Sequence, residues 1–192
     1  MLRTKTVMGL LLIAVFAGLV LAGSGTAVAQ NQSDVFWVAY YNTGVSSASA
    51  NSLGAVTVIN PGTSGGTLCA DIYVFDPQEE LKECCSIPVS INGFLCLSLT
   101  GLTNNPANGV YSSTGAIKIV ADQYPNCDPT NPKPTPELRA SIFNVNSSIT
   151  EIHFQPAPLS AQELFQLGLQ CSFVPNQSGP GVCFAAVSGM KK

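Results

Sequence analysis

The chain has 192 residues, of which 46% are hydrophobic and only 10% are charged, with a formal net charge of −3. Its few basic side chains are scattered, and the one adjacent pair is Lys191-Lys192, so no basic face is available to replace the counterions of a nucleic acid. We therefore exclude nucleic acid as a partner. The plentiful, periodic apolar residues also exclude an intrinsically disordered chain.

The first 29 residues have the three parts of a secretion signal. A basic stretch with Arg3 and Lys5 precedes an apolar run over 7–22, and a small-residue segment ends in an A-x-A sequence at Ala29. The apolar run has 16 residues, fewer than the ~20 that span a bilayer, which disfavours an uncleaved anchor. We expect cleavage near Ala29, no membrane span in the mature chain 30–192, and a secreted protein that is extracellular or periplasmic.

The mature chain would have 163 residues, with six basic and eleven acidic side chains and a net charge of −5. A chain of this length suits one domain that buries roughly two thirds of its unfolded surface. We therefore predict a single domain over 30–192.

Short β-rich runs separated by turn residues make up most of this domain. Asn-Pro-Gly at 60–62, Asn-Pro at 105–106, Asp-Pro at 128–129 and three prolines over 132–136 punctuate them. This spacing predicts an all-β fold, an antiparallel β-sandwich of immunoglobulin-like or jelly-roll-like type. We expect strands over 35–41, 54–60, 68–75, 80–85, 94–99, 116–121, 138–145 and 150–155, and long loops over 101–114 and 124–137.

Alternation of apolar and polar residues assigns faces to three of the strands. In 68–75 the even-numbered residues share one side and the odd-numbered residues share the other. Ile117 and Ile119 should face inward, as should Ile152 and Phe154. The sequence Asp-Pro-Gln-Glu at 76–79 suits a type I turn, which would fold 68–75 onto 80–85 as a hairpin.

One short α-helix is predicted near the C-terminal end, over about 161–170. Ser160 and Glu163 form an S-x-x-E capping box, and Leu159 and Leu164 are placed as a hydrophobic staple. We expect the helix to pack on the sandwich through an apolar surface made by Leu164, Phe165, Leu167 and Leu169.

Seven cysteines follow the signal, and in an oxidising compartment they predict disulfides. A zinc site is disfavoured because no C-x-x-C occurs and His153 is the only histidine. Cys171 and Cys183 flank a turn-rich loop, and closing so short a loop would stabilise the fold by about 3 kcal/mol, so we predict that they pair. The other bonds, and the odd cysteine that is free or joins two chains, stay open among Cys69, Cys84, Cys85, Cys96 and Cys127.

Cys84 and Cys85 are adjacent on a predicted strand, so their side chains should point to opposite faces and bond elsewhere. A strained vicinal disulfide between them is the alternative. Two or three disulfides are therefore expected in all.

The run LCADIYVFDPQEELKECC over 68–85 resembles the core of an uncharacterised family of secreted, cysteine-containing bacterial proteins. The segments GAIKIV at 115–120, TPELRA at 135–140, APLS at 157–160, CSFV at 171–174 and GVC at 181–183 are similar to the same pattern. The chain departs from it at Ser86-Ile87, where the pattern has another cysteine. The resemblance implies secretion and a disulfide-bearing β fold, and it transfers no functional residue.

Signals for catalysis are weak. His153 is the one candidate base for a Ser or Cys hydrolase, and neither G-x-S-x-G nor a P-loop occurs. Glu79, Glu80 and Glu83 offer carboxylates to a glycosidase, but charges beside a turn are ordinarily solvated. We expect no catalytic residue, no cofactor and no metal, because the Asp122/Asn126/Asp128/Asn131 loop also lacks the spacing of a calcium loop.

Aromatic side chains are the remaining candidates. Trp37, Tyr40 and Tyr41 crowd the first strand, where an exposed ring could stack on a sugar, although a core position is the expectation for Trp37. We predict a non-enzymatic structural or surface-interaction protein that acts through strand edges or an intermolecular disulfide. A carbohydrate-binding module is the alternative, and a secreted hydrolase is third. The expected partners are a second copy, a surface protein or a glycan.

Overall fold

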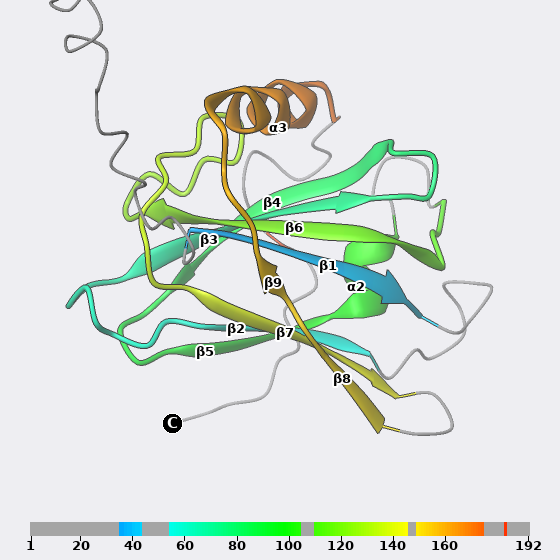
Figure 1. The fold of residues 1–192 in the computed structure, drawn as a ribbon, viewed down its shortest axis with the longest axis horizontal. Coiled ribbons are helices and arrows are strands. Elements are labelled where there is room, and N and C mark those ends of the chain that lie inside the picture. Colours follow the sequence, from blue (N-terminus) through cyan, green and yellow to red (C-terminus); the bar gives the residue numbers. More distant parts are fainter. Residues whose placement is uncertain (1–34, 44–53, 105–109, 146–148, 175–182, 184–192) are drawn as a thin grey trace, which may run out of the picture. The chain divides into compact units, whose positions relative to one another are not determined.

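The computed structural model describes residues 35–43, 54–104, 110–145, 149–174 and 183. The predicted signal peptide, with its cleavage at Ala29, lies outside these residues. Within them, two antiparallel sheets pack face to face and a helix covers the outside of one sheet (Figure 1). The prediction of an antiparallel β-sandwich with a C-terminal helix is confirmed. Among the described residues, no helix is long and apolar enough to cross a membrane.

Each sheet pairs its neighbouring strands antiparallel. The five-stranded sheet has the order β4-β3-β6-β1-β9, and the four-stranded sheet has the order β5-β2-β7-β8. The first contains β1 (Phe36–Asn42), β3 (Leu68–Phe75), β4 (Leu81–Val89), β6 (Thr114–Gln123) and β9 (Gln155–Pro156). The second contains β2 (Ala55–Ile59), β5 (Phe94–Ser98), β7 (Arg139–Val145) and β8 (Ile149–His153).

The core between the sheets is built by the inward faces of alternating strands. Ile117 and Ile119 of β6 are fully buried there, as are Val56 and Val58 of β2. Phe154 is also buried, and Ile152 packs against the same cluster. The inward positions predicted for Ile117, Ile119, Ile152 and Phe154 are therefore confirmed.

β3 is buried at all eight residues, because both of its faces are covered. Its even-numbered residues, among them Ile72 and Val74, belong to the inter-sheet core. Tyr73 and Phe75 belong to a second apolar cluster on the outer side of the sheet, together with Leu167 and Cys171 of the helix α3 (Ala161–Phe173). The predicted two faces of this strand thus pack against two different layers.

The hairpin between β3 and β4 closes as predicted. The backbone N–H of Glu79 donates to the carbonyl of Asp76 at 3.1 Å, which is the bond of a type I turn. Glu79 then adopts a φ of 65° before the chain enters β4. The strand β4 extends to Val89, four residues beyond the predicted end.

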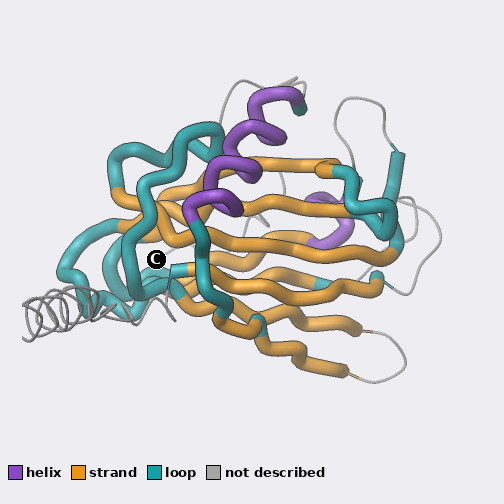
Figure 2. Tube along the Cα trace, turned by 45° about the horizontal axis from the view of Figure 1, so that its top comes forward, coloured by secondary structure: helices purple, strands orange, loops and turns teal. Residues whose placement is uncertain are grey.

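The helix α3 begins where the capping residue predicts, since the Ser160 hydroxyl accepts the N–H of Glu163 at 3.0 Å. It ends at Phe173, three residues later than predicted. Figure 2 shows the helix (purple) lying across the strands of the sandwich. The four apolar residues do not form one surface, however. Leu164 and Leu167 face the sheet, whereas Phe165 and Leu169 are exposed, because four residues within two turns spread around a helix of 3.6 residues per turn.

A second helix, α2 (Leu99–Thr103), replaces the start of the loop predicted over 101–114. Ser98 caps it by accepting the N–H of Gly101 at 3.3 Å, so β5 ends one residue earlier than expected. Gly101 and two threonines are poor helix formers, which explains why the sequence pattern does not predict this turn.

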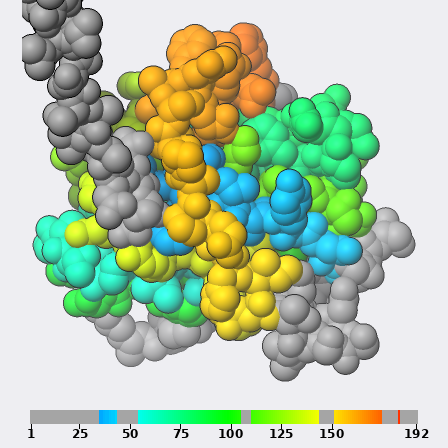
Figure 3. Space-filling view, in the orientation of Figure 1, coloured from blue at the N-terminus to red at the C-terminus, as the bar shows by residue number. Residues whose placement is uncertain are grey.

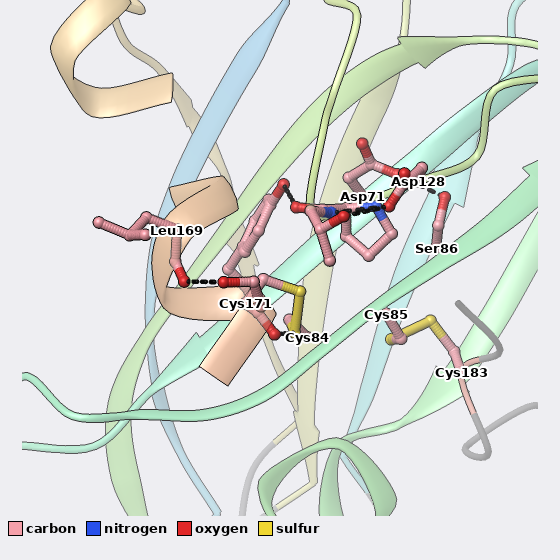
Figure 4. The surroundings of a disulfide bond; sticks show 12 residues. Asp71, Cys84, Cys85, Ser86, Asp128, Leu169, Cys171 and Cys183 are labelled. Carbon is pink, nitrogen blue, oxygen red and sulfur yellow. Dashed lines mark hydrogen bonds between the residues drawn. A yellow bond between two sulfur atoms is a disulfide. The ribbon is translucent and has the colours of Figure 1, made fainter. Parts of the chain in front are cut away.

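Three disulfides join Cys69 to Cys127, Cys84 to Cys171 and Cys85 to Cys183. The predicted Cys171–Cys183 pair is therefore wrong, and the vicinal alternative does not occur. Cys84 and Cys85 point to opposite faces of β4, as Figure 4 shows, so one meets α3 and the other enters the core. This alternation sends Cys171 and Cys183 to different partners. Cys96 is the free cysteine among the described residues.

Candidate functional site

A groove of about 700 Å³ lies between α3 and the outer face of the five-stranded sheet. One row of paired residues crosses its floor: Phe75 on β3, Ala116 on β6 and Tyr40 on β1. The single methyl group of Ala116 between two aromatic rings leaves the space open. We call this site the Tyr40 groove.

Tyr40 is the most exposed large apolar side chain of the described residues, with 80% of its surface open to solvent. Trp37 and Tyr41 retain only 7% and 2%, because they lie on the opposite, core-facing side of β1. Of the three stacking candidates, only Tyr40 can present its ring to a ligand. Figure 3 shows β1 (blue) reaching the surface below α3 (orange).

Gly115 fixes the floor of the Tyr40 groove. Its φ of 157° is in the region that side chains rarely adopt, and a Cβ at this position would overlap the carbonyl oxygen of Phe75. The same carbonyl accepts the Tyr41 hydroxyl at 3.2 Å. Burial raises the pKa of Tyr41, so this hydroxyl keeps its proton and remains a donor.

The β3–β4 turn forms one wall of the groove. The Asp76 carboxylate accepts the N–H groups of Gln78 and Glu80, each at 2.9 Å, and lies 2.9 Å from the Lys82 amine. Although burial acts in the opposite direction, these hydrogen bonds from Lys82 and the turn backbone lower the pKa of Asp76. The turn is thus held rigidly, and it places the exposed Glu79 beside the groove.

The opposite wall belongs to α3. The Lys118 amine donates to the Glu163 carboxylate at 2.6 Å and lies 4.9 Å from the centre of the Phe75 ring. Gln166 and Gln170, one helical turn apart, extend this wall with exposed amides. This wall was not predicted from the sequence, although the spacing of Glu163, Gln166 and Gln170 places them on one face of a helix.

The charges in the groove argue against an anionic ligand. Lys118 is the one cation among the lining residues, and Glu163 already neutralises it; Lys82 likewise neutralises Asp76, while Glu79 adds negative charge. The lining therefore combines an exposed aromatic ring, two amides that both donate and accept, and no unpaired cation. This set suits a neutral, hydroxyl-rich ligand with an apolar face.

The candidate catalytic residues are dispersed. His153 is exposed on β8, with its Nδ1 atom 3.7 Å from Glu151, and it lies on the other sheet from the groove. Glu80 bonds Lys82, whereas burial raises the pKa of Glu83 to about 7. Only Glu79 of the three predicted carboxylates lines the groove, so the structure does not bring these groups together.

Asp122 and Asp128, which were considered as possible calcium ligands, instead accept hydrogen bonds from the loop over 124–137 and its flanking residues. The Asp122 carboxylate accepts the N–H groups of Gln123 and Lys133 and the amide of Asn126, at 2.6, 2.6 and 2.8 Å. The Asp128 carboxylate accepts the N–H and the hydroxyl of Thr130. Within the described ranges, no group of three acidic, histidine or cysteine side chains could hold a metal.

A buried acid lies beneath this loop. Asp71 is fully buried on β3, where it accepts the Ser86 hydroxyl, while its Oδ2 atom has no hydrogen-bond partner. Burial raises the pKa of Asp71 to about 8; the Ser86 hydroxyl opposes this rise, and the charges of Asp122 and Asp128 add to it. Asp71 therefore keeps its proton to a higher pH than an ordinary aspartate does.

The free Cys96 lies on β5, the edge strand of the four-stranded sheet, and is partly exposed. It is remote in topology from the Tyr40 groove, whose strands all belong to the other sheet. The proposal of an intermolecular disulfide at the odd cysteine thus concerns this residue, and non-reducing electrophoresis tests it.

Comparison with known proteins adds no assignment to this geometry. No protein-family model, curated protein or solved structure matches the chain.

Proposed function

We propose that this chain is an exported, non-enzymatic carbohydrate-binding module that takes a neutral saccharide in the Tyr40 groove. The observation that carries this proposal is the open Tyr40 ring over a groove lined by amides. A groove of this kind favours the binding module over a purely structural role. Export by the predicted signal peptide, in a bacterium as the family resemblance implies, is part of the proposal, and the three disulfides support an oxidising destination.

Stacking on Tyr40 would supply the apolar part of the binding free energy. One face of a pyranose ring carries mainly C–H groups, and covering an exposed aromatic ring with it removes apolar surface of both partners from water. Tyr40 pairs with Ala116 of β6, and β9 holds the same strand at Trp37 and Val38, so little backbone entropy is lost when the ligand binds.

Gln166, Gln170 and Glu79 would supply the directional contacts. An amide donates and accepts at once, as a sugar hydroxyl does, so two amides one turn apart can pair with neighbouring hydroxyls. Glu79 lies on the opposite wall of the groove, where its carboxylate would accept a hydrogen bond from another hydroxyl of the sugar. An acidic sugar would meet this carboxylate without a free cation to compensate, so neutral sugars should be preferred.

The test is calorimetric titration with neutral hexaoses of glucose, mannose and N-acetylglucosamine, and with a uronic acid oligomer of equal length. We expect binding to at least one neutral series and none to the acidic one. Tyr40→Ala should weaken binding about tenfold, the equivalent of about 1.4 kcal/mol, whereas Tyr40→Phe should retain it. Gln166→Ala and Gln170→Ala should each weaken it about fivefold.

Tyr124→Ala is the matched control, because Tyr124 is also an exposed tyrosine, at 51%, but does not line the groove. It should bind as the wild type does. The proposal fails if no neutral series binds, or if Tyr40→Ala and Tyr124→Ala have equal effects.

A further inference from the structure

The outward side of α3 carries a stripe of large apolar side chains. Phe165, Leu169 and Phe173 follow each other at intervals of four residues and expose 64%, 40% and 76% of their surface. In Figure 4 Leu169 points away from the Cys84–Cys171 bond that anchors the helix. Exposed apolar stripes of this kind are uncommon on monomeric proteins and mark contact surfaces.

A hollow of about 530 Å³ runs beside this stripe. Gly168 lies at its base, where an added Cβ would come within 2.6 Å of the Thr130 carbonyl oxygen, so the helix and the loop are in close contact there. Pro132 and Leu164 give it apolar walls. The same face of α3 therefore has both protruding rings and a recess that can receive a ring.

The stripe is also symmetric about its centre, since Phe165 and Phe173 are equally far from Leu169. We propose that a second copy of this chain docks here, with the two α3 helices antiparallel across a two-fold axis near Leu169. Phe165 of one copy then faces Phe173 of the other, twice, as an isologous interface requires.

Charge supports a second copy as the occupant. The only charged residue of α3 is Glu163, which bonds Lys118 on the sheet side of the helix. Two stripes can therefore meet without contact between like charges, although the whole chain has a net charge of −3. Antiparallel helices also place their dipoles in the favourable orientation.

The available area is consistent with a stable dimer. The two rings of each copy expose roughly 280 Å², if a phenylalanine has ~200 Å² of surface. Both copies together would bury roughly 560 Å² of ring surface, a large share of the apolar area in a standard interface of about 1,600 Å². The Leu169 side chains and the hollow add to this value.

The proposed interface leaves the Tyr40 groove open. The groove uses Glu163, Gln166 and Gln170 of α3, whereas Phe165 and Leu169 of the stripe line the hollow on the other flank of the helix. A dimer would thus display two saccharide sites, and a polymeric glycan that reaches both would bind with avidity. Dimerisation itself does not depend on saccharide binding.

The test measures molar mass by light scattering and sedimentation in a Cys96→Ser background, which removes any disulfide-linked dimer. At ~100 µM, above the micromolar Kd of a weak standard interface, the expected mass is twice that of the chain. Leu169→Glu places two like charges at the two-fold axis and should give the single-chain mass. Near-UV circular dichroism should show that Leu169→Glu remains folded.

Phe94→Glu is the matched control, because Phe94 exposes 46% of its surface but belongs to β5 on the other sheet. It should stay dimeric, as should Tyr40→Ala, which separates this inference from the saccharide proposal. A single-chain mass for the Cys96→Ser protein overturns the proposal. Co-sedimentation of single chains with phosphatidylcholine vesicles, lost in Leu169→Glu, would assign the stripe to lipid and also overturn it.

Discussion

The two sheets share one core but differ on their outer faces. The outer face of the five-stranded sheet is covered by α3 and by the loop over 124–137, and it buries Phe36, Tyr73 and Val120. On the four-stranded sheet, Ile59 and Phe94 expose 41% and 46% of their surface, and His153 is exposed as well. No described helix lies over this second face (Figure 1).

The covered face is also the cross-linked one. Cys69–Cys127 holds the loop to β3, and Cys84–Cys171 holds α3 to β4. The Tyr40 groove and the apolar stripe both depend on α3, so both depend on the Cys84–Cys171 bond. In this fold the layer added to the sandwich carries the candidate functions, and disulfides fix that layer where a thirteen-residue helix alone would dock weakly.

A large effect is expected for the bond that fixes α3. Cys84→Ser with Cys171→Ser should lower the free energy of unfolding by about 3 kcal/mol, because the intact Cys85–Cys183 bond already joins the two segments and Cys84–Cys171 closes only a short further loop in the unfolded chain. Urea unfolding followed by circular dichroism measures it. Hydrogen exchange should show α3 losing its protection before the sheets do.

Cys96→Ser serves as the control, since Cys96 is free, and its effect should stay within about 0.5 kcal/mol. Equal protection losses in α3 and in β2 of the double variant would contradict the view that the bond serves the added layer.

The next effect concerns Asp71 and is seen through pH. Its pKa is about 8 in the folded chain and near 3.8 in the unfolded one, so the folded state holds an extra proton between these values. Stability should therefore be greatest near pH 4, fall by up to about 1.4 kcal/mol per pH unit, and level off above pH 8. Asp71→Asn, which is neutral at every pH, should remove the Asp71 part of this slope and be the more stable protein at pH 8.

Glu83→Gln distinguishes the contribution of Glu83 from that of Asp71, since both carboxyls have a raised pKa. Burial raises the pKa of Glu83 only to about 7, so its part of the slope ends there, and the fall between pH 7 and pH 8 belongs mainly to Asp71. Urea unfolding in steps from pH 4 to pH 9 gives both profiles. Parallel curves for the wild type and Asp71→Asn would show that the acid beside Asp122 and Asp128 does not titrate in this range.

Local sequence signals predicted the strands and the start of α3. The disulfide pairing depends on tertiary contacts and was not predicted. The run over 68–75 and the capping residue Ser160 placed a strand and a helix start, because alternation and capping depend only on neighbouring residues. The pairing of Cys171 could not be predicted, since it depends on which face of β4 meets α3.

The candidate site shows the same division. Alternation along β1 separates Tyr40 from Trp37 and Tyr41, so the sequence contained the information that only Tyr40 of these three residues shares the Phe75 face. The groove itself required α3 to lie over Ala116, and no local pattern specifies that contact. Likewise, no local sequence pattern predicts that Asp71 lies close enough to Asp122 for their charges to interact.

The smallest effect is expected for a substitution on the outer face of the four-stranded sheet. Phe94→Ala should change the free energy of unfolding by about 0.5 kcal/mol, because nearly half of this ring is already in water and its removal opens no cavity. Phe36→Ala, the same substitution on the covered face at 4% exposure, should cost about 3–5 kcal/mol. Urea unfolding of the two variants therefore compares the two outer faces directly. A loss at Phe94 near that at Phe36 would mean that the four-stranded sheet is covered in solution by another part of the chain or by a second copy, and the contrast between the faces would then disappear.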